Sequence, residues 1–224
     1  MKPISEVFHG DCMAFMAGLP DKSIGLAIVD PPYQGADAIG LKDNIGRKSQ
    51  SAKRSNYKQF DNIAPPDSYF AELARVSKNT IIWGGNFFGC KGGVIAWNKN
   101  GTAFGEGEVA ICTTHKSVRF FEYTWNGMLQ GNMSNKEARI HPTQKPVALY
   151  EWLLRNYAKP GDKILDTHLG SQSSRIAAYK LGFDFWGCEI DDDYIRDGNA
   201  RFEKEIAMPL FDPIPQPEQK LLFQ

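Results

Sequence analysis

The sequence lacks the features that mark several common classes of protein. Its four cysteines, Cys12, Cys90, Cys112 and Cys188, are scattered without a C-x-x-C pair, which argues against a zinc site. No apolar run is long enough to span a bilayer. The N-terminus also lacks the apolar core of a signal peptide. We therefore expect a soluble, cytoplasmic protein with reduced thiols, no metal and no membrane contact.

Net charge is also absent, because 26 basic side chains balance 26 acidic ones. The distribution is uneven, however. Residues 42–58 hold six Lys or Arg against one Asp, whereas the chain from Asp184 onward carries ten acidic and four basic residues. The length of 224 residues and a hydrophobic content of 42% suit one α/β domain. We expect that domain over residues 1–208, with a mobile basic loop at 34–62 and an extended, proline-rich tail at 209–224.

Short apolar runs alternate with amphipathic segments along the chain. Helices are expected at 67–77, with Asp67 as N-cap, and at 146–161, 173–182 and 193–206. Strands are expected at 24–30, 79–85, 92–99, 162–166 and 184–191, and residues 108–115 and 118–125 are expected to form a hairpin. This alternation predicts an α/β fold with a mainly parallel sheet covered on both faces.

Residues 163–191 read as one strand–turn–helix–strand unit. Gly170 in the turn allows close approach of a ligand, and Glu189 ends the following strand 19 positions later. An acidic residue at about that distance binds ribose hydroxyls in dinucleotide folds. A plain unit without a ligand remains an alternative, and the unit alone does not separate NAD from S-adenosylmethionine.

The stretch GLAIVDPPYQG, residues 25–35, ends a buried strand in a carboxylate, two prolines and an aromatic ring. Ligands bind beyond the carboxyl ends of strands in open α/β sheets. Asp30 and the Pro31 carbonyl are acceptors there, and Tyr33 offers a flat face. Two acceptors beside a stacking surface suit a planar group that bears NH₂, such as a nucleobase. Hydrogen bonds to those acceptors would make the amine nitrogen a better nucleophile toward a methyl group.

With these residues the chain resembles the amino DNA methyltransferases that use S-adenosylmethionine, enzymes of the kind found in restriction-modification systems. DPPY matches their catalytic motif. HGDCMAFMAGLPDKSIGLAIVDPPY matches the approach to it, and HPTQKPVALYEWLLRNYAKPGDKILDTHLGS matches their cofactor region. The catalytic motif comes first, as in the circularly permuted β group. The fold implied is Rossmann-like, with a seven-stranded, mainly parallel sheet and one antiparallel strand.

The resemblance also implies roles at matching positions. The base would be held by Asp30, Pro31, Pro32 and Tyr33, with Tyr33 stacking on a base flipped from the duplex. The implied cofactor-binding residues are Asp11, Asp30, His141, Thr143, Lys145, Asp166, Leu169, Gly170, Ser171, Ser173 and Glu189.

Within that set, Asp11 would bind the cofactor's adenine amine and Glu189 its ribose. His141, Thr143 and Lys145 would lie near the methionine carboxylate, with Asp166 and the turn on the methionine side. The chain departs from the family pattern at Gln172, where a second glycine is usual. Its side chain is expected either to narrow the methionine end of the pocket or to point to solvent.

Three further features bear on partners. Lys48, Lys53, Arg54 and Lys58 form either a phosphate clamp for double-stranded DNA or a solvated surface. The aromatic residues of segment 105–139 either face DNA or, for most of them, pack the sheet edge. The C-terminal QKLLFQ loosely resembles a sliding-clamp docking peptide with Gln219, Leu222 and Phe223 as anchors. A homodimer would supply extra DNA contacts.

The leading hypothesis is a DNA methyltransferase acting on adenine N6, because Asp begins the motif and cytosine N4 enzymes of the family more often have Ser there. Cytosine N4 is the first alternative, and RNA is not excluded as a substrate. A second hypothesis is a catalytically weakened module that binds DNA or cofactor, motivated by Gln172. A third is an NAD enzyme, which leaves DPPY unexplained. No Pro-Cys pair occurs, which argues against the covalent cysteine route to carbon 5 of cytosine.

Overall fold

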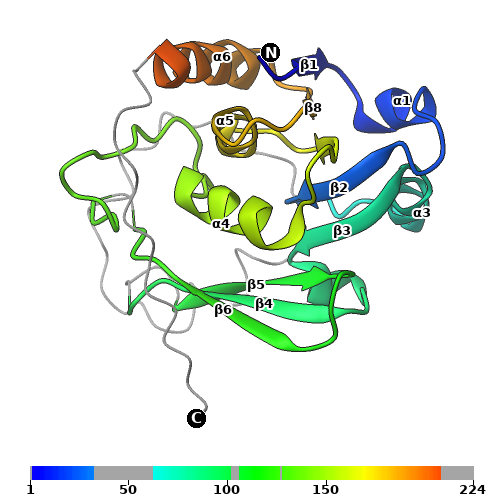
Figure 1. Cartoon of the computed structure of the whole chain (residues 1–224), viewed down its shortest axis with the longest axis horizontal. Coiled ribbons are helices and arrows are strands. Elements are labelled where there is room, and N and C mark those ends of the chain that lie inside the picture. The colour runs from blue at the N-terminus through cyan, green and yellow to red at the C-terminus, as the bar shows by residue number, and fades with distance from the viewer. Residues whose placement is uncertain (1, 33–62, 102–105, 127, 208–224) are drawn as a thin grey trace.

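The computed structural model describes residues 2–32, 63–101, 106–126 and 128–207. In these ranges one eight-stranded sheet runs in the order β1-β8-β7-β2-β3-β5-β4-β6 (Figure 1). The strands are β1 (Ser5–His9), β2 (Ile24–Val29), β3 (Ser77–Trp83), β4 (Gly93–Asn98), β5 (Gly107–Cys112), β6 (Val118–Glu122), β7 (Ile164–Asp166) and β8 (Phe185–Glu189). Only β5 is antiparallel to its neighbours. The expected Rossmann-like, mainly parallel sheet is confirmed, with eight strands where seven were expected.

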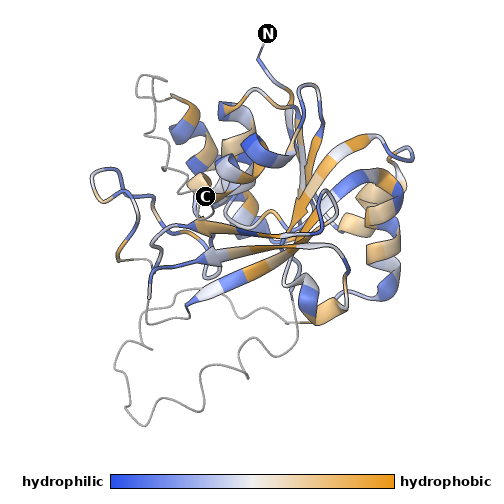
Figure 2. Cartoon of the chain, turned by 60° about the horizontal axis from the view of Figure 1, so that its bottom comes forward, coloured by the Kyte–Doolittle hydropathy of each residue, from blue (hydrophilic) through white to orange (hydrophobic). Residues whose placement is uncertain are grey.

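Helices cover both faces of the sheet (Figure 1). The helices α1 (Cys12–Ala17) and α3 (Asp67–Val76) lie on one face, and α4 (Val147–Tyr157), α5 (Ser173–Lys180) and α6 (Asp192–Ala207) lie on the other, with a short 3₁₀ turn η2 (Gly85–Phe88) after β3. Every residue of β2 is buried, because both layers cover this central strand. Hydrophobic residues follow the inner strands (Figure 2). None of the helices in these ranges is long and apolar enough to cross a membrane.

The expected helices are present, but Asp67 is not the N-cap of α3. Pro66 holds that position with extended backbone, φ −69° and ψ 163°, and no side chain caps the helix. Two consecutive prolines keep the chain extended up to residue 66, and the helix begins directly after them, one residue earlier than an N-cap at Asp67 would place it. Asp67 is instead the first helical residue, where its negative charge is still favourable to the helix dipole.

The expected hairpin between β5 and β6 is wrong. The β5 strand pairs antiparallel with β4 and β3, whereas β6 pairs parallel with β4. The connecting residues explain this, because Gly93 and Val94 at the start of β4 donate backbone hydrogen bonds to His115 and Ser117. The connection therefore crosses the end of β4 and brings β6 to its far side.

Most aromatic side chains of segment 105–139 pack as expected, although not all do. Phe121 and Trp125 are buried in the core under α4. Phe120, on the opposite face of the same strand, is 67% exposed. Strand alternation therefore separates the two neighbouring phenylalanines, and only Phe120 is available to a partner.

The side chain of Gln172 corrects both expectations for it. Gln172 is fully buried and points to α6, where its amide donates to Asn199 Oδ1 at 3.1 Å and accepts from Arg175 at 2.8 Å. Its backbone is left-handed, with φ 62° and ψ 23°, which is the conformation that favours glycine. Gly198 makes room for it, because a Cβ there would lie 2.5 Å from Gln172 Nε2. Gln172 therefore neither narrows a ligand pocket nor reaches solvent.

We predict that Gly198→Ala destabilises the protein although alanine is the better helix former. The new methyl group would overpack Gln172, at a cost of about 1–3 kcal/mol, against a helix-propensity gain of about 1 kcal/mol. In a Gln172→Gly background the space is free, and the same substitution should be neutral or stabilising. Urea unfolding of the four proteins measures this coupling, and equal effects of Gly198→Ala in both backgrounds would contradict it.

Candidate active site

The corner after β2 presents one carboxylate oxygen that has no partner. Asp30 follows Val29, the last residue of the strand, directly. Its Oδ2 accepts a hydrogen bond from Lys145 Nζ at 2.5 Å. Its Oδ1 is buried and has no hydrogen-bond partner among the residues that the structure describes. A buried acceptor of this kind costs free energy unless a ligand or water satisfies it, so Oδ1 is a candidate ligand contact.

Lys145 links Asp30 to a second carboxylate. Its side chain is only 3% exposed, and its ammonium lies 3.0 Å from Glu108 Oε2 as well as against Asp30. It also lies over the Trp83 ring at 5.2 Å from the centroid. The resemblance assigned Lys145 to the cofactor's methionine carboxylate, whereas the structure places its ammonium against the carboxylates of Asp30 and Glu108.

The two carboxylates that share Lys145 differ in acidity. Burial raises the pKa of Asp30 above its usual range, although Lys145 opposes that shift, and the charge of Glu108 adds to it. Burial also acts to raise the pKa of Glu108, but Lys145 and Lys99 outweigh it and hold that pKa at about 2. Glu108 is therefore ionised at neutral pH, and Asp30 is the member of the pair that protonates more easily.

The turn after β7 brings three of the predicted residues together. Gly170 has φ +48°, and its amide donates to Glu189 Oε2 at 2.7 Å. A Cβ on Gly170 would lie 3.4 Å from the His141 ring, which covers the turn. The left-handed backbone favours glycine here, whereas the ring is only at van der Waals distance from a Cβ. The 19-residue spacing between Gly170 and Glu189 thus corresponds to a direct contact.

Asp166 lies beneath this turn at the same edge of the sheet as Asp30, since β7 and β2 are parallel neighbours. It is buried and accepts hydrogen bonds from Ser174 Oγ at 2.6 Å and the His168 amide at 3.1 Å. Burial raises its pKa to about 7 against those hydrogen bonds, and the charges of Asp30 and Glu189 add to the shift. No cationic side chain of the described residues pairs with Asp166, so its negative charge is uncompensated whenever the carboxyl is ionised.

The ends of β1 and β8 complete the edge. His9 and Glu189 are register partners in the two strands, which places Asp11 two residues beyond this pair. Asp11 caps α1 through one oxygen, Oδ1, which accepts from the amides of Met13 and Ala14. Glu189 Oε1 accepts from two amides of the following loop. Both carboxylates are oriented by backbone donors.

The segment before α4 supplies His141 and Thr143. The Thr143 amide and hydroxyl lie 3.3 and 3.1 Å from His141 Nδ1, and the His141 ring contacts Tyr194 of α6 at 4.4 Å between centroids. Burial lowers the pKa of His141 to about 4, and the charges of Lys145 and Arg139 contribute. The ring is therefore neutral at physiological pH.

Sequence reasoning missed Arg201 and Glu108. Arg201 of α6 is buried and donates to the Ser171 carbonyl at 2.6 Å, to Ser173 Oγ at 2.9 Å and to Glu137 at 2.6 Å. It ties the turn to the segment before α4. An arginine in a polar helix and a glutamate in an alternating strand look like surface residues in a sequence, so neither position carried a signal.

Several predicted residues lie outside the described ranges. They are Tyr33 of the motif, the basic residues Lys48, Lys53, Arg54 and Lys58, and the tail residues Gln219, Leu222 and Phe223. Pro31 and Pro32 are described, and Pro31 is buried beside Asp30. Leu169 is buried in the turn, where its amide bonds to Cys188 of β8.

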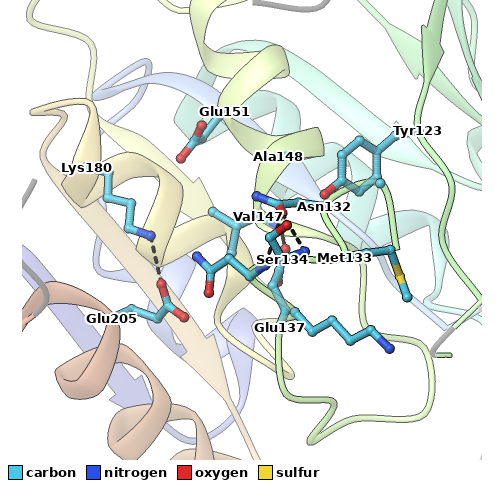
Figure 3. A pocket seen from close by; sticks show the side chains of 13 residues that line it. Tyr123, Asn132, Met133, Ser134, Glu137, Val147, Ala148, Glu151, Lys180 and Glu205 are labelled. Atoms are coloured by element: carbon cyan, nitrogen blue, oxygen red, sulfur yellow. Dashed lines mark hydrogen bonds and ion pairs between the residues drawn. The ribbon is translucent and has the colours of Figure 1, made fainter. Parts of the chain in front are cut away.

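A separate hollow of about 550 Å³ lies between segment 131–137 and the helices α4, α5 and α6 (Figure 3). Its wall carries the ion pair of Lys180 with Glu205, at 2.8 Å, and the buried Glu151. None of its lining residues is among those predicted for the site.

Comparison with known proteins extends this picture. A family model for DNA methylases of the N6/N4 type matches residues 97–200, which include Lys145, Asp166 and Glu189 but not Asp30. YubD of Escherichia coli (strain K12), which carries a provisional methylase name, is 24% identical over 210 residues, 88% of this chain and 90% of its own length. The type II methyltransferase M.HinfI of Haemophilus influenzae is 23% identical over 250 residues, 90% of this chain and 69% of its own.

Solved structures share the fold. The complex of M1.HpyAVI with SAM aligns with a TM-score of 0.54 and 19% identity, over 88% of this chain and 98% of that one. The cytosine-N4-specific PvuII DNA methyltransferase aligns with a TM-score of 0.60 and 13% identity, over 92% of this chain and 93% of that one. The match of residues 97–200 to the DNA methylase model, the two sequence relatives and the shared fold together support an amino DNA methyltransferase of the N6/N4 type.

Proposed function

We propose that the chain is an S-adenosylmethionine-dependent DNA methyltransferase that acts on N6 of adenine. The observation that supports this most directly is Asp30, whose Oδ2 is fixed by Lys145 while Oδ1 is buried with no partner in the part of the chain that the structure describes. An exocyclic amine of a base is a donor that fits this acceptor. The amine is otherwise a poor nucleophile, because its lone pair is delocalised into the ring.

The residues of the corner would activate that amine by holding it. Asp30 Oδ1 and the Pro31 carbonyl accept its two N–H groups and draw the nitrogen toward tetrahedral geometry, which frees the lone pair. The cofactor, when bound, supplies an electrophilic methyl group on a sulfonium. In the transfer, the nitrogen would gain the methyl carbon as the methyl–sulfur bond breaks and leaves its electron pair on the sulfur. The nitrogen would then lose one N–H proton to water, so the product amine is neutral.

The sheet edge around Asp166 carries the acidic side chains that a cationic cofactor needs. S-adenosylmethionine carries a sulfonium and an ammonium group, and Asp166 is a buried carboxylate without a cationic partner among the described residues. We propose that Asp166 faces the methionine ammonium and that Glu189 and Asp11 bind the ribose and the adenine amine. His141 and Thr143 would form the closing wall of the cofactor site. The turn after β7 would line the site with Leu169, Gly170, Ser171 and Ser173.

Cytosine N4 is the second candidate. The fold is shared with PvuII methyltransferase, which is named cytosine-N4-specific, whereas Asp30 at the head of the motif favours adenine. The hypothesis of a weakened binding module was motivated by Gln172, and the burial of that side chain against α6 removes its motivation.

The remaining expectations are kept as proposals. Double-stranded DNA is the proposed substrate, with Tyr33 stacking on the flipped base and the basic residues of 42–58 contacting phosphates. The same proposal includes the permuted motif order, a single domain over 1–208, a homodimer and clamp docking through the tail.

The base assignment can be checked directly. The purified chain, given tritiated S-adenosylmethionine and unmethylated bacterial DNA, should transfer label that is recovered as N6-methyladenine after digestion to nucleosides. Label in N4-methylcytosine would establish the second candidate. Transfer to neither DNA nor RNA would refute the methyltransferase proposal.

We predict that Asp30→Asn lowers the rate of methyl transfer by about a hundredfold or more at saturating cofactor, since the fixed anionic acceptor is lost. The matched control is Asp67→Asn, which makes the same chemical change at an exposed helix start. A rate for Asp30→Asn within a few-fold of that of the unsubstituted protein would refute the role of Asp30 in holding the amine.

The pKa of Asp166 predicts how cofactor affinity depends on pH. The pKa of this carboxyl is about 7 in the free protein, and a cationic ligand binds its ionised form. The affinity should therefore rise with pH by up to about tenfold per unit below pH 7 and level off above it. Calorimetry with S-adenosylmethionine between pH 5.5 and 8.5 measures this, and Asp166→Asn should flatten the slope. An unchanged slope in that variant would argue against the contact.

A further inference from the structure

Four alternating charges lead from the outer strands to the candidate catalytic acid. Lys99, directly after β4, pairs with Glu108 of β5, and Glu108 also lies 3.0 Å from Lys145. Lys145 then pairs with Asp30 at 2.5 Å. The contacts form a continuous row of cation, anion, cation and anion, and nothing in the family match or in the sequence motifs assigns a role to its outer half.

Tryptophan rings contact both lysines of this row of charges. Lys99 lies over the Trp97 ring at 4.8 Å and Lys145 lies over the Trp83 ring at 5.2 Å. The two tryptophan rings contact each other edge to face, with centroids 6.3 Å apart, and both are fully buried. The Lys99 side chain is 12% exposed and that of Lys145 is 3% exposed, so water screens these charges weakly.

We infer that Glu108 is a positioning residue, which acts through Lys145 to set how strongly Asp30 is held and how readily it ionises. The inference rests on the proposed function of Asp30. Glu108 and Asp30 compete for one ammonium, and Lys99 neutralises Glu108 from the other side. Removing Glu108 ends its competition with Asp30 for Lys145, whereas removing Lys99 leaves Glu108 to draw Lys145 away from Asp30.

The sign of each effect follows from Coulomb's law. The negative charge of Glu108 raises the pKa of Asp30, and the positive charges of Lys145 and Lys99 lower it. Among the described residues, Asp166 from β7 and Tyr150 from α4 also interact electrostatically with Asp30. The charge of Glu108 also acts on Tyr150, but burial keeps the pKa of Tyr150 well above its usual range, so Tyr150 stays neutral between pH 5 and 9.

Two isosteric substitutions should therefore move the acid limb of the pH–rate profile in opposite directions. Glu108→Gln should shift it to lower pH, because the pKa of Asp30 falls. Lys99→Met should shift it to higher pH, because that pKa rises. Methyl transfer to DNA is measured from pH 5 to 9, and Glu106→Gln is the matched control, since it removes an exposed charge next to the same strand. This control should leave the limb in place.

A second readout does not depend on activity. Carboxyl ¹³C NMR of Asp-labelled protein, assigned with Asp30→Asn, reports the ionisation of Asp30 in each variant. Opposite shifts for Glu108→Gln and Lys99→Met support the inference. If the ionisation of Asp30 shifts in the same direction in both variants, or in neither, the inference is overturned. That holds even if both variants lose activity equally, because a merely structural role of the row would produce such a loss. If the unsubstituted protein transfers no methyl group, the proposed function fails, while the NMR shifts still decide the role of Glu108.

Discussion

The contact between the Lys145 ammonium and the Asp30 carboxylate is the constraint on which the rest of the site depends. Both groups are largely buried, and removing Lys145 would leave the Asp30 carboxylate in the interior without its cation, a change that costs roughly 3–5 kcal/mol. Lys145 lies four residues beyond His141, whose ring covers Gly170. One short segment therefore holds the acid after β2 with one end and the turn after β7 with the other. The spacing of HPTQK is thus a geometric link between the two halves of the site.

The charges at this edge of the sheet explain how the site can select its ligands. Asp30, Asp166 and Glu189 gather where three parallel strands end, and Lys145 is bound to Asp30 at one end only. The end around Asp166 therefore favours a cation, while the corner at Asp30 keeps an acceptor for a neutral N–H donor. Backbone amides orient Glu189, and Arg201 anchors the turn from behind. A cationic cofactor and an uncharged amine can thus be bound side by side without competing for one group.

Local sequence patterns predicted the parts of this arrangement that depend on neighbours along the chain. The strand that ends at Asp30 and the unit from β7 to Glu189 were predictable, because apolar runs, a glycine turn and a fixed spacing determine them. The pairing of β6 was not, since a five-residue connection that crosses a strand end looks like a hairpin loop. Glu108 and Arg201 were also missed, because each acts on a partner about 30 residues or more away. Long-range packing leaves no local signature in the residue that uses it.

Gln172 shows why a motif mismatch need not mean a lost function. The family glycine at this position provides a left-handed backbone, and Gln172 adopts the same conformation with φ 62°. The strain of a non-glycine residue there, on the order of 1 kcal/mol, is offset by its hydrogen bonds to Asn199 and Arg175. The space that its side chain needs is provided by Gly198 in the facing helix. The pair Gln172 and Gly198 thus allows a non-glycine residue in this left-handed turn, with its side chain packed against α6.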